Sequence, residues 1–164
     1  MSNTVTGYNR TQIVLHWVIA ALLVFQFVGN DAIVEVYELI NKGQTVESLP
    51  ILVRGHVLLG ILILILAVWR VFLRLTRGAP SLPAEESAAL KVVANAAHII
   101  LYAAIFIMPL SGIGAWFGGQ AIADTVHTTF KFVFLASIAL HFIGAVYQQH
   151  VLKTNIIKRM TKAE

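Results

Sequence analysis

Long apolar stretches and short polar stretches follow one another along the whole chain. A helix needs about 20 mostly apolar residues to cross the hydrocarbon core. Four runs meet this length, roughly at Thr11–Val28, Leu52–Leu73, Val92–Ile113 and Val126–Gln148. The runs lack the alternation of barrel strands, and helices satisfy their own backbone groups in lipid. The pattern therefore predicts an all-α, integral membrane four-helix bundle that forms one domain over residues 1–164.

Two local features refine this prediction. The first polar connection, Asn30–Ile51, is acidic, and within it Ala32–Ile40 is expected to form a short helix at the membrane interface. In the third apolar run, Pro109 is expected to bend or end the helix, because proline has no backbone N–H to donate to the preceding turn.

Composition and charge support lipid as the solvent and predict an orientation. Only 12% of the residues are charged, against about 25% in soluble domains. With four spans, both termini and the second connection share one side. That side carries most basic residues: Arg10, Arg70, Arg74, Arg77, Lys91, Lys153, Lys158, Arg159 and Lys162. The other side has Lys42, Arg54 and Lys131. The positive-inside rule places both termini in the cytoplasm.

The same distribution predicts which partners the chain has. The basic residues are spread over three short membrane flanks, and no soluble domain remains to present a nucleic-acid-binding face. We therefore expect membrane lipid, and not nucleic acid, as the surrounding partner.

Histidines are the unusual residues of the predicted spans. Six occur, and five of them lie inside or at the edge of a span: His16, His56, His98, His127 and His141. A polar ring in a membrane helix needs a partner, so a group of five indicates a function. His127 and His141 are fourteen residues apart, nearly four helical turns. Both therefore lie on one helix face, about 21 Å apart along the axis.

Depth in the membrane then predicts two pairs. His16 lies at the depth of His141, near the cytoplasmic surface, and His56 lies at the depth of His127, near the opposite surface. Each pair is a two-imidazole clamp of the kind that a six-coordinate haem iron requires. His98, in the cytoplasmic half of the third span, competes with His16, or contacts a haem propionate or a bound quinone. We prefer His16 as the ligand.

The surroundings of the histidines also favour haem. Haem propionates are anionic, and Arg54 and Lys131 flank the outer pair while Arg70 lies near the depth of the inner pair. Arg70 is equally well explained as a boundary residue whose charged group reaches the interface. The chain has no Cys, which excludes covalent haem attachment and iron–sulfur clusters.

One alternative is a non-redox four-helix protein whose histidines bind a metal ion or only pack. No Asp or Glu lies inside a predicted span, although Asp124 stands at the start of the fourth. Cation pathways usually combine carboxylates with histidines, whereas a haem needs only neutral imidazoles. The pattern therefore favours two b haems.

The sequence resembles the bacterial cytochrome b561 family, which is related to the cytochrome b subunits of nickel–iron hydrogenases and formate dehydrogenases. The resemblance covers nearly the whole chain. It rests on YNRTQIVLHW at Tyr8–Trp17, RGHVLLGILILILAVWRVFLRL at Arg54–Leu75, AHIILYAAIFIMPLSGI at Ala97–Ile113, VHTTFKFVFLASIALHFIGA at Val126–Ala145 and LKTNIIKRM at Leu152–Met160.

The resemblance implies four helices and two haem b groups in the bacterial inner membrane, with His16, His56, His127 and His141 as axial ligands. It implies electron transfer between a periplasmic-side donor and the quinone pool, with ubiquinone or menaquinone as acceptor. One branch of the family oxidises superoxide. The related alternative is a membrane anchor subunit for a soluble dehydrogenase. The chain departs from the family at Gln148-Gln149, where members often carry paired histidines near a quinone site.

Overall fold

The computed structural model describes residues 7–28, 30–81 and 86–163, and in these residues it contains helices and no strand. The elements are α1 (Arg10–Val28), α2 (Asn30–Asn41), α3 (Ile51–Arg77), α4 (Ala88–Trp116), α5 (Ala121–His150) and α6 (Ile156–Arg159). The prediction of an all-α protein is confirmed.

Four of these helices are long and apolar enough to cross a membrane, namely α1, α3, α4 and α5. They contain the four apolar runs and extend beyond them. The 27 residues of α3, for example, correspond to a rod of about 40 Å, longer than the hydrocarbon core of about 30 Å. Large apolar side chains such as Ile65 and Phe142 are exposed on the outside of the bundle, as lipid contact requires.

The third span does not end at its proline. α4 continues through Pro109 to Trp116. Two residues after Pro109, the Ser111 hydroxyl donates to the carbonyl oxygens of Ile107, at 2.6 Å, and Met108, at 3.0 Å. Serine hydroxyls in membrane helices commonly bond to carbonyl oxygens of the preceding turn in this way.

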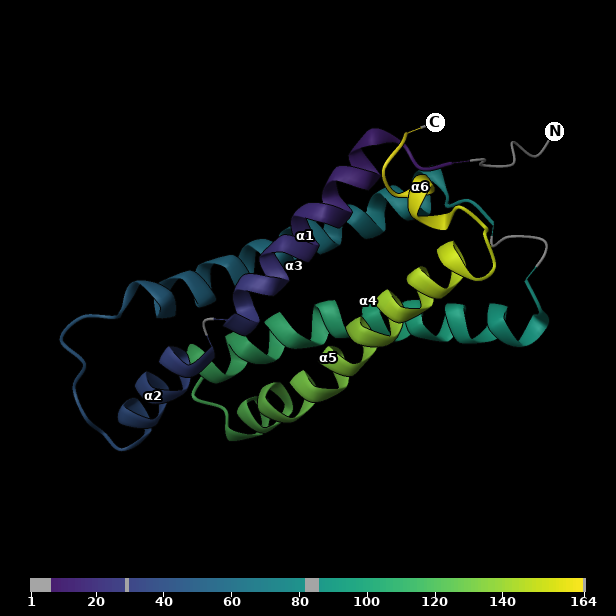
Figure 1. Ribbon diagram of the computed structural model, residues 1–164. Coiled ribbons are helices and arrows are strands. Elements are labelled where there is room, and N and C mark those ends of the chain that lie inside the picture. Colours follow the sequence, from purple (N-terminus) through teal and green to yellow (C-terminus); the bar gives the residue numbers. More distant parts are fainter. Residues whose placement is uncertain (1–6, 29, 82–85, 164) are drawn as a thin grey trace.

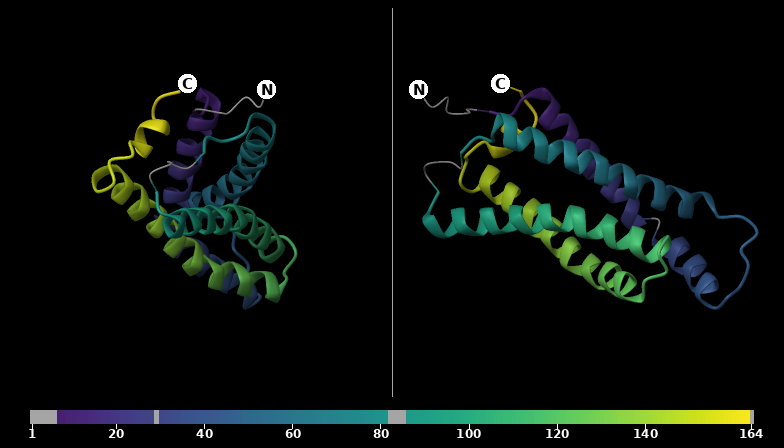
Figure 2. Two further views of the ribbon diagram at one scale, coloured as in Figure 1. Left: turned by 90° about the vertical axis from the view of Figure 1, so that its right-hand side faces the viewer. Right: turned by 180° about the vertical axis from the view of Figure 1, so that it is seen from behind.

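The long helices pack as two pairs, α1 with α3 and α4 with α5, and the contact between α3 and α4 joins the pairs. α4 packs most extensively on α5, α1 packs on α3, and α3 packs on α4. Within the described residues, α5 has its close packing with α4 and α6, and not with α1 or α3. The two pairs diverge from one another along the bundle in Figures 1 and 2. This arrangement leaves α5 facing α1 and α3 through side chains alone.

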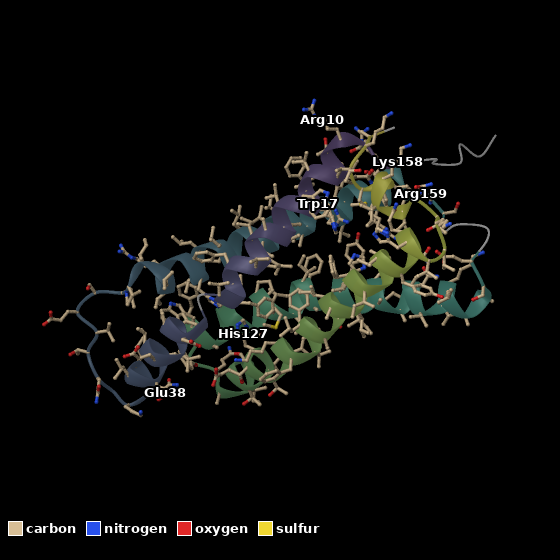
Figure 3. All side chains as sticks on the ribbon, viewed as in Figure 1. Arg10, Trp17, Glu38, His127, Lys158 and Arg159 are labelled. Atoms are coloured by element: carbon tan, nitrogen blue, oxygen red, sulfur yellow. The ribbon has the colours of Figure 1, made fainter. Side chains whose placement is uncertain are left out.

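One end of the bundle brings together the start of α1, the end of α3 and the C-terminal segment. Gln12 Nε2 donates to the carbonyl oxygen of Gly78 at 3.0 Å, and Trp17 Nε1 donates to that of Met160 at 2.6 Å. Figure 3 shows Trp17 at this end and His127 toward the other. We call this the inner end, following the predicted orientation, and the opposite one the outer end.

The outer end carries α2, which lies next to the bundle in Figure 1. The expected short helix in the first connection is thus present. Val36 is buried, and the Tyr37 ring stacks on the Trp116 ring with centroids 6.2 Å apart. The acidic residues Glu35 and Glu38 are exposed. α2 therefore presents an apolar side to the bundle and a polar side away from it.

Candidate functional site

The outer histidine pair consists of His56 on α3 and His127 on α5. Their ring centroids are 6.1 Å apart, and the ring planes are inclined by 74°. His127 Nδ1 lies 2.8 Å from the Met108 carbonyl oxygen and 3.2 Å from the Ser111 hydroxyl. Because a carbonyl only accepts, Nδ1 carries the proton, and Nε2 keeps its lone pair for a metal ion.

A cavity of about 160 Å³ surrounds this pair. Most of its lining is apolar, and both histidines, Gly60 and Lys131 belong to it. The predicted position of Lys131 beside the outer pair therefore agrees with the structure. Arg54 is exposed and is not among the lining residues. Of the two outer cations singled out in the sequence, only Lys131 borders the space between the rings.

The inner group contains three histidines. The His16 and His141 rings have centroids 6.3 Å apart with planes inclined by 69°. The His98 ring on α4 is nearer to His141, at 5.1 Å and 75°. His98 Nδ1 also lies 2.7 Å from the carbonyl oxygen of Ala94, one turn earlier in its own helix. The structure thus brings together all three histidines that sequence depth placed at this level.

These distances can be compared with the spacing that one iron imposes. An imidazole nitrogen binds a metal at about 2.0 Å and its ring centroid lies about 1.1 Å behind it, so two axial rings have centroids about 6 Å apart. The His56–His127 and His16–His141 separations match this value. The His98–His141 separation is about 1 Å shorter.

Arg70 joins the inner group to α1. Its guanidinium donates to the carbonyl oxygen of Gln12 at 3.0 Å and is half-buried. It lies close enough to His16, His98 and His141 to act on all three electrostatically. Because its head group binds a backbone carbonyl of α1, Arg70 is held beside the histidines.

Three further residues lie at the outer pair and were not predicted from the sequence: Gln26, Ser111 and Gly112. Gln26 lines the cavity and donates through Nε2 to the backbone carbonyl of His56 at 3.1 Å. Ser111 contacts His127 as described. At Gly112, an added Cβ would lie 3.0 Å from His127 Cε1, so only glycine leaves the ring its place.

Signals for two of these residues exist in the sequence. Gln26 is the one amide within the apolar stretch between Trp17 and Val28. Ser111 follows a proline in a membrane helix, a position where hydroxyls commonly bond to backbone groups. Nothing in the sequence pairs Gly112 with His127, because the two residues belong to different helices.

Comparisons with known proteins agree with this architecture. The family model described as prokaryotic cytochrome b561 matches residues 7–163. A protein named cytochrome b562 from Cereibacter sphaeroides is 30% identical over 159 residues, which cover 95% of this chain and 96% of that protein. No solved structure matches the chain.

Proposed function

This chain belongs to the prokaryotic cytochrome b561 family, and on this basis we propose that it carries electrons between a periplasmic-side donor and the quinone pool through two haem b groups. The family makes it a multi-pass b-type cytochrome of the bacterial inner membrane that serves electron transport. Our proposal adds the number of haems, their histidine ligands, the direction of electron transfer and the use of a quinone as acceptor.

The observation that carries the proposal is the repeated ring separation. Two histidine pairs, His56–His127 and His16–His141, have centroids 6.1 and 6.3 Å apart, near the roughly 6 Å expected for two axial ligands of one iron. α5 contributes one member of each pair. In our assignment these four residues are the axial ligands, and His98 is not one.

The residues around both pairs fit haem b. The outer pair lies in a largely apolar cavity, and one ring nitrogen of His127 is anchored by a backbone carbonyl so that the other is free to bind. When bound, haem b supplies a one-electron iron couple. The chain orients the imidazoles, shields them from water between helices, and provides Lys131 and Arg70 as cations for the propionates.

The direction follows from the predicted orientation. With haem bound, the outer pair would hold the group that receives electrons and the inner group the one that passes them on, where His98 would be available to contact ubiquinone or menaquinone. Superoxide is the specific donor that the family resemblance offers. Lys131 at the cavity attracts an anion, whereas exposed Glu35 and Glu38 on α2 repel one. A superoxide-generating system in place of dithionite, with haem reduction followed at the alpha band, tests this donor.

A non-redox metal-binding role has less support. Structural metal sites use about four protein ligands and catalytic ones about three. In the part of the chain that the structure describes, no group of three His, Cys, Asp or Glu side chains could hold a metal ion. Two-histidine clamps are suited to haem, because the porphyrin supplies the remaining ligands.

The test is a dithionite-reduced minus air-oxidised absorbance spectrum of detergent-purified protein, with haem quantified per chain as the pyridine complex. We expect a sharp b-type alpha band and two haems per chain. One haem per chain would contradict the two-site assignment. A protein expressed with ample haem that shows no Soret band would overturn the proposal.

A further inference from the structure

Two buried polar atoms at the outer histidine pair have no hydrogen-bond partner. In the described residues, the buried side-chain atoms that lack a partner are Gln26 Oε1, His56 Nδ1 and Glu86 Oε2. The first two belong to residues that line the same cavity. Buried polar groups are nearly always paired, so two unpaired atoms in one cavity call for an explanation.

In this structure the two atoms are not hydrogen-bonded to each other, but an existing hydrogen bond links their residues. Gln26 Nε2 donates to the backbone carbonyl of His56 at 3.1 Å. Oε1 belongs to the same amide as Nε2, and Nδ1 belongs to the same residue as that carbonyl. The reverse orientation of the amide would oppose two acceptors, so the contact also determines which amide atom remains free.

The chemistry of the two atoms is complementary. A histidine that binds iron through Nε2 carries its remaining proton on Nδ1, and this N–H needs an acceptor. His127 has the Met108 carbonyl for this purpose, at 2.8 Å. For His56, the unpaired buried acceptor among the described residues of the cavity is Gln26 Oε1.

We infer that Gln26 is a positioning residue for His56: its amide oxygen accepts the Nδ1 proton of the ligating ring, orients that ring, and lowers the reduction potential of the outer haem. The inference rests on the proposed ligation of the outer haem by His56. A hydrogen bond from Nδ1–H makes the imidazole a stronger donor to iron, which favours the oxidised state.

Space around Gln26 supports this role. A Cβ added at Gly60, one turn after His56 on α3, would lie 3.7 Å from Gln26 Nε2. The Gln26 side chain therefore lies over the helix face that carries His56 and Gly60. An amide at this position reaches the ligand ring from α1, whereas His127 receives its acceptor from α4. The two ligands of one haem would thus be oriented from two different helices.

The test is a spectroelectrochemical redox titration of purified wild-type protein and two variants. The outer transition is identified as the one missing from His127→Ala protein. Gln26→Met keeps the length of the side chain and removes the acceptor, so the outer potential should rise while the inner potential stays constant. Gln26→Glu keeps an acceptor, so its outer potential should remain at or below the wild-type value.

The oxidised outer haem provides a second measurement by low-temperature EPR, because its g values depend on the relative orientation of the two rings. We expect them to change in Gln26→Met and to be largely restored in Gln26→Glu. Loss of the outer haem from Gln26→Met, with retention in Gln26→Glu, would equally support the inference. Thr125→Val is the control, since Thr125 is exposed on α5, lies outside the cavity lining and bonds within its own helix. It should change neither potential.

The outcomes separate the two levels of the argument. Wild-type protein without two redox transitions would overturn the proposed function and this inference with it. Two transitions in the wild type, with an outer potential and EPR signal unchanged in Gln26→Met, would overturn the role of Gln26 alone. Equal shifts in Gln26→Met and Gln26→Glu would do the same, because they would point to a steric effect.

Discussion

The outer and inner histidine groups differ in the number of histidines they contain. The outer group has two histidines, His56 and His127, beside a cavity whose lining includes them. The inner group has three, and His141 stands between His16 and His98 with centroid separations of 6.3 and 5.1 Å. At the outer end, the two histidines present form the one possible pair. At the inner end, His141 can pair with either His16 or His98, and the ring separations distinguish the two pairs.

The difference bears on what each end does. Under the proposed ligation, a haem iron would take two histidines, so the outer end would have none left over. An end with three keeps one imidazole that can donate or accept a hydrogen bond. Arg70 and Arg74 lie close enough to His98 to act on it electrostatically. Under the proposed function, the quinone would therefore bind at the inner end, where one imidazole remains for a hydrogen bond.

The largest expected effect is the loss of one whole haem. His127→Ala should leave one haem per chain and remove the outer redox transition, because the outer end offers no third histidine as a substitute. Pyridine haemochrome quantitation measures this directly. His150→Ala is the control and should retain both haems, since His150 is exposed at the end of α5. Loss of both haems from folded His127→Ala protein would contradict the assignment of the histidines to two independent haem sites.

A comparison of His16→Ala with His98→Ala sharpens the inner assignment. We expect His16→Ala to lose the inner haem and His98→Ala to keep two haems, because only the His16–His141 separation matches axial ligation. Haem content and the reduced-minus-oxidised spectrum of both variants are the measurements. The reverse result would make His98 the ligand and free His16 for the second role.

A partial effect is expected from the glycine against the outer pair. In Gly112→Ala the added Cβ would lie 3.0 Å from His127 Cε1 and 3.2 Å from Nδ1, so the ring must shift. Overpacking of this kind typically costs about 1–3 kcal/mol. The outer haem should be bound more weakly, measured as reduced occupancy after extended purification, while the inner haem provides the internal control. Full occupancy of both sites would show that the ring has room to move.

The smallest expected effect is electrostatic. Arg70→Gln removes a positive charge beside the inner group, so the oxidised, more positive haem becomes relatively more stable and its potential falls. The guanidinium is half-buried, and we expect a shift of no more than about 60 mV, which corresponds to a tenfold change in a one-electron equilibrium. Redox titration measures it, and the outer potential should stay constant. A rise of the inner potential would contradict this sign.

Sequence reasoning predicted the four spans because each one is a long apolar run with polar flanks. Several of the helices extend past the predicted spans, since α3 continues to Arg77 and α5 to His150, whereas α1 ends at Val28 as the first apolar run does. A helix can continue through polar and basic residues where it leaves the hydrocarbon core and enters the headgroup region. Hydropathy alone does not show where such a helix ends. The spacing of His127 and His141, in contrast, could be interpreted directly. In a regular helix, the number of residues between two side chains gives both their difference in depth and the face they share.

Contacts between helices could not be read from the sequence. Depth identified His98 as a competitor of His16, but the 5.1 Å approach of His98 to His141 depends on how α4 packs on α5. Gln148 illustrates the same limit. Its sequence position only marked a departure from the family, whereas in the structure it donates to the buried Glu86 and accepts from Thr154 at 2.8 Å.

The placement of one histidine of each pair on α5 has a consequence for the spacing of the two histidine groups. Under the proposed ligation, the α5 ligands of the two haems, His127 and His141, would lie on a single continuous helix, fourteen residues or about 21 Å apart along its axis. Tilting of the molecule in a thicker or thinner bilayer leaves the spacing of His127 and His141 unchanged. An insertion or deletion within α5 would alter it directly, by about 1.5 Å per residue along the helix axis.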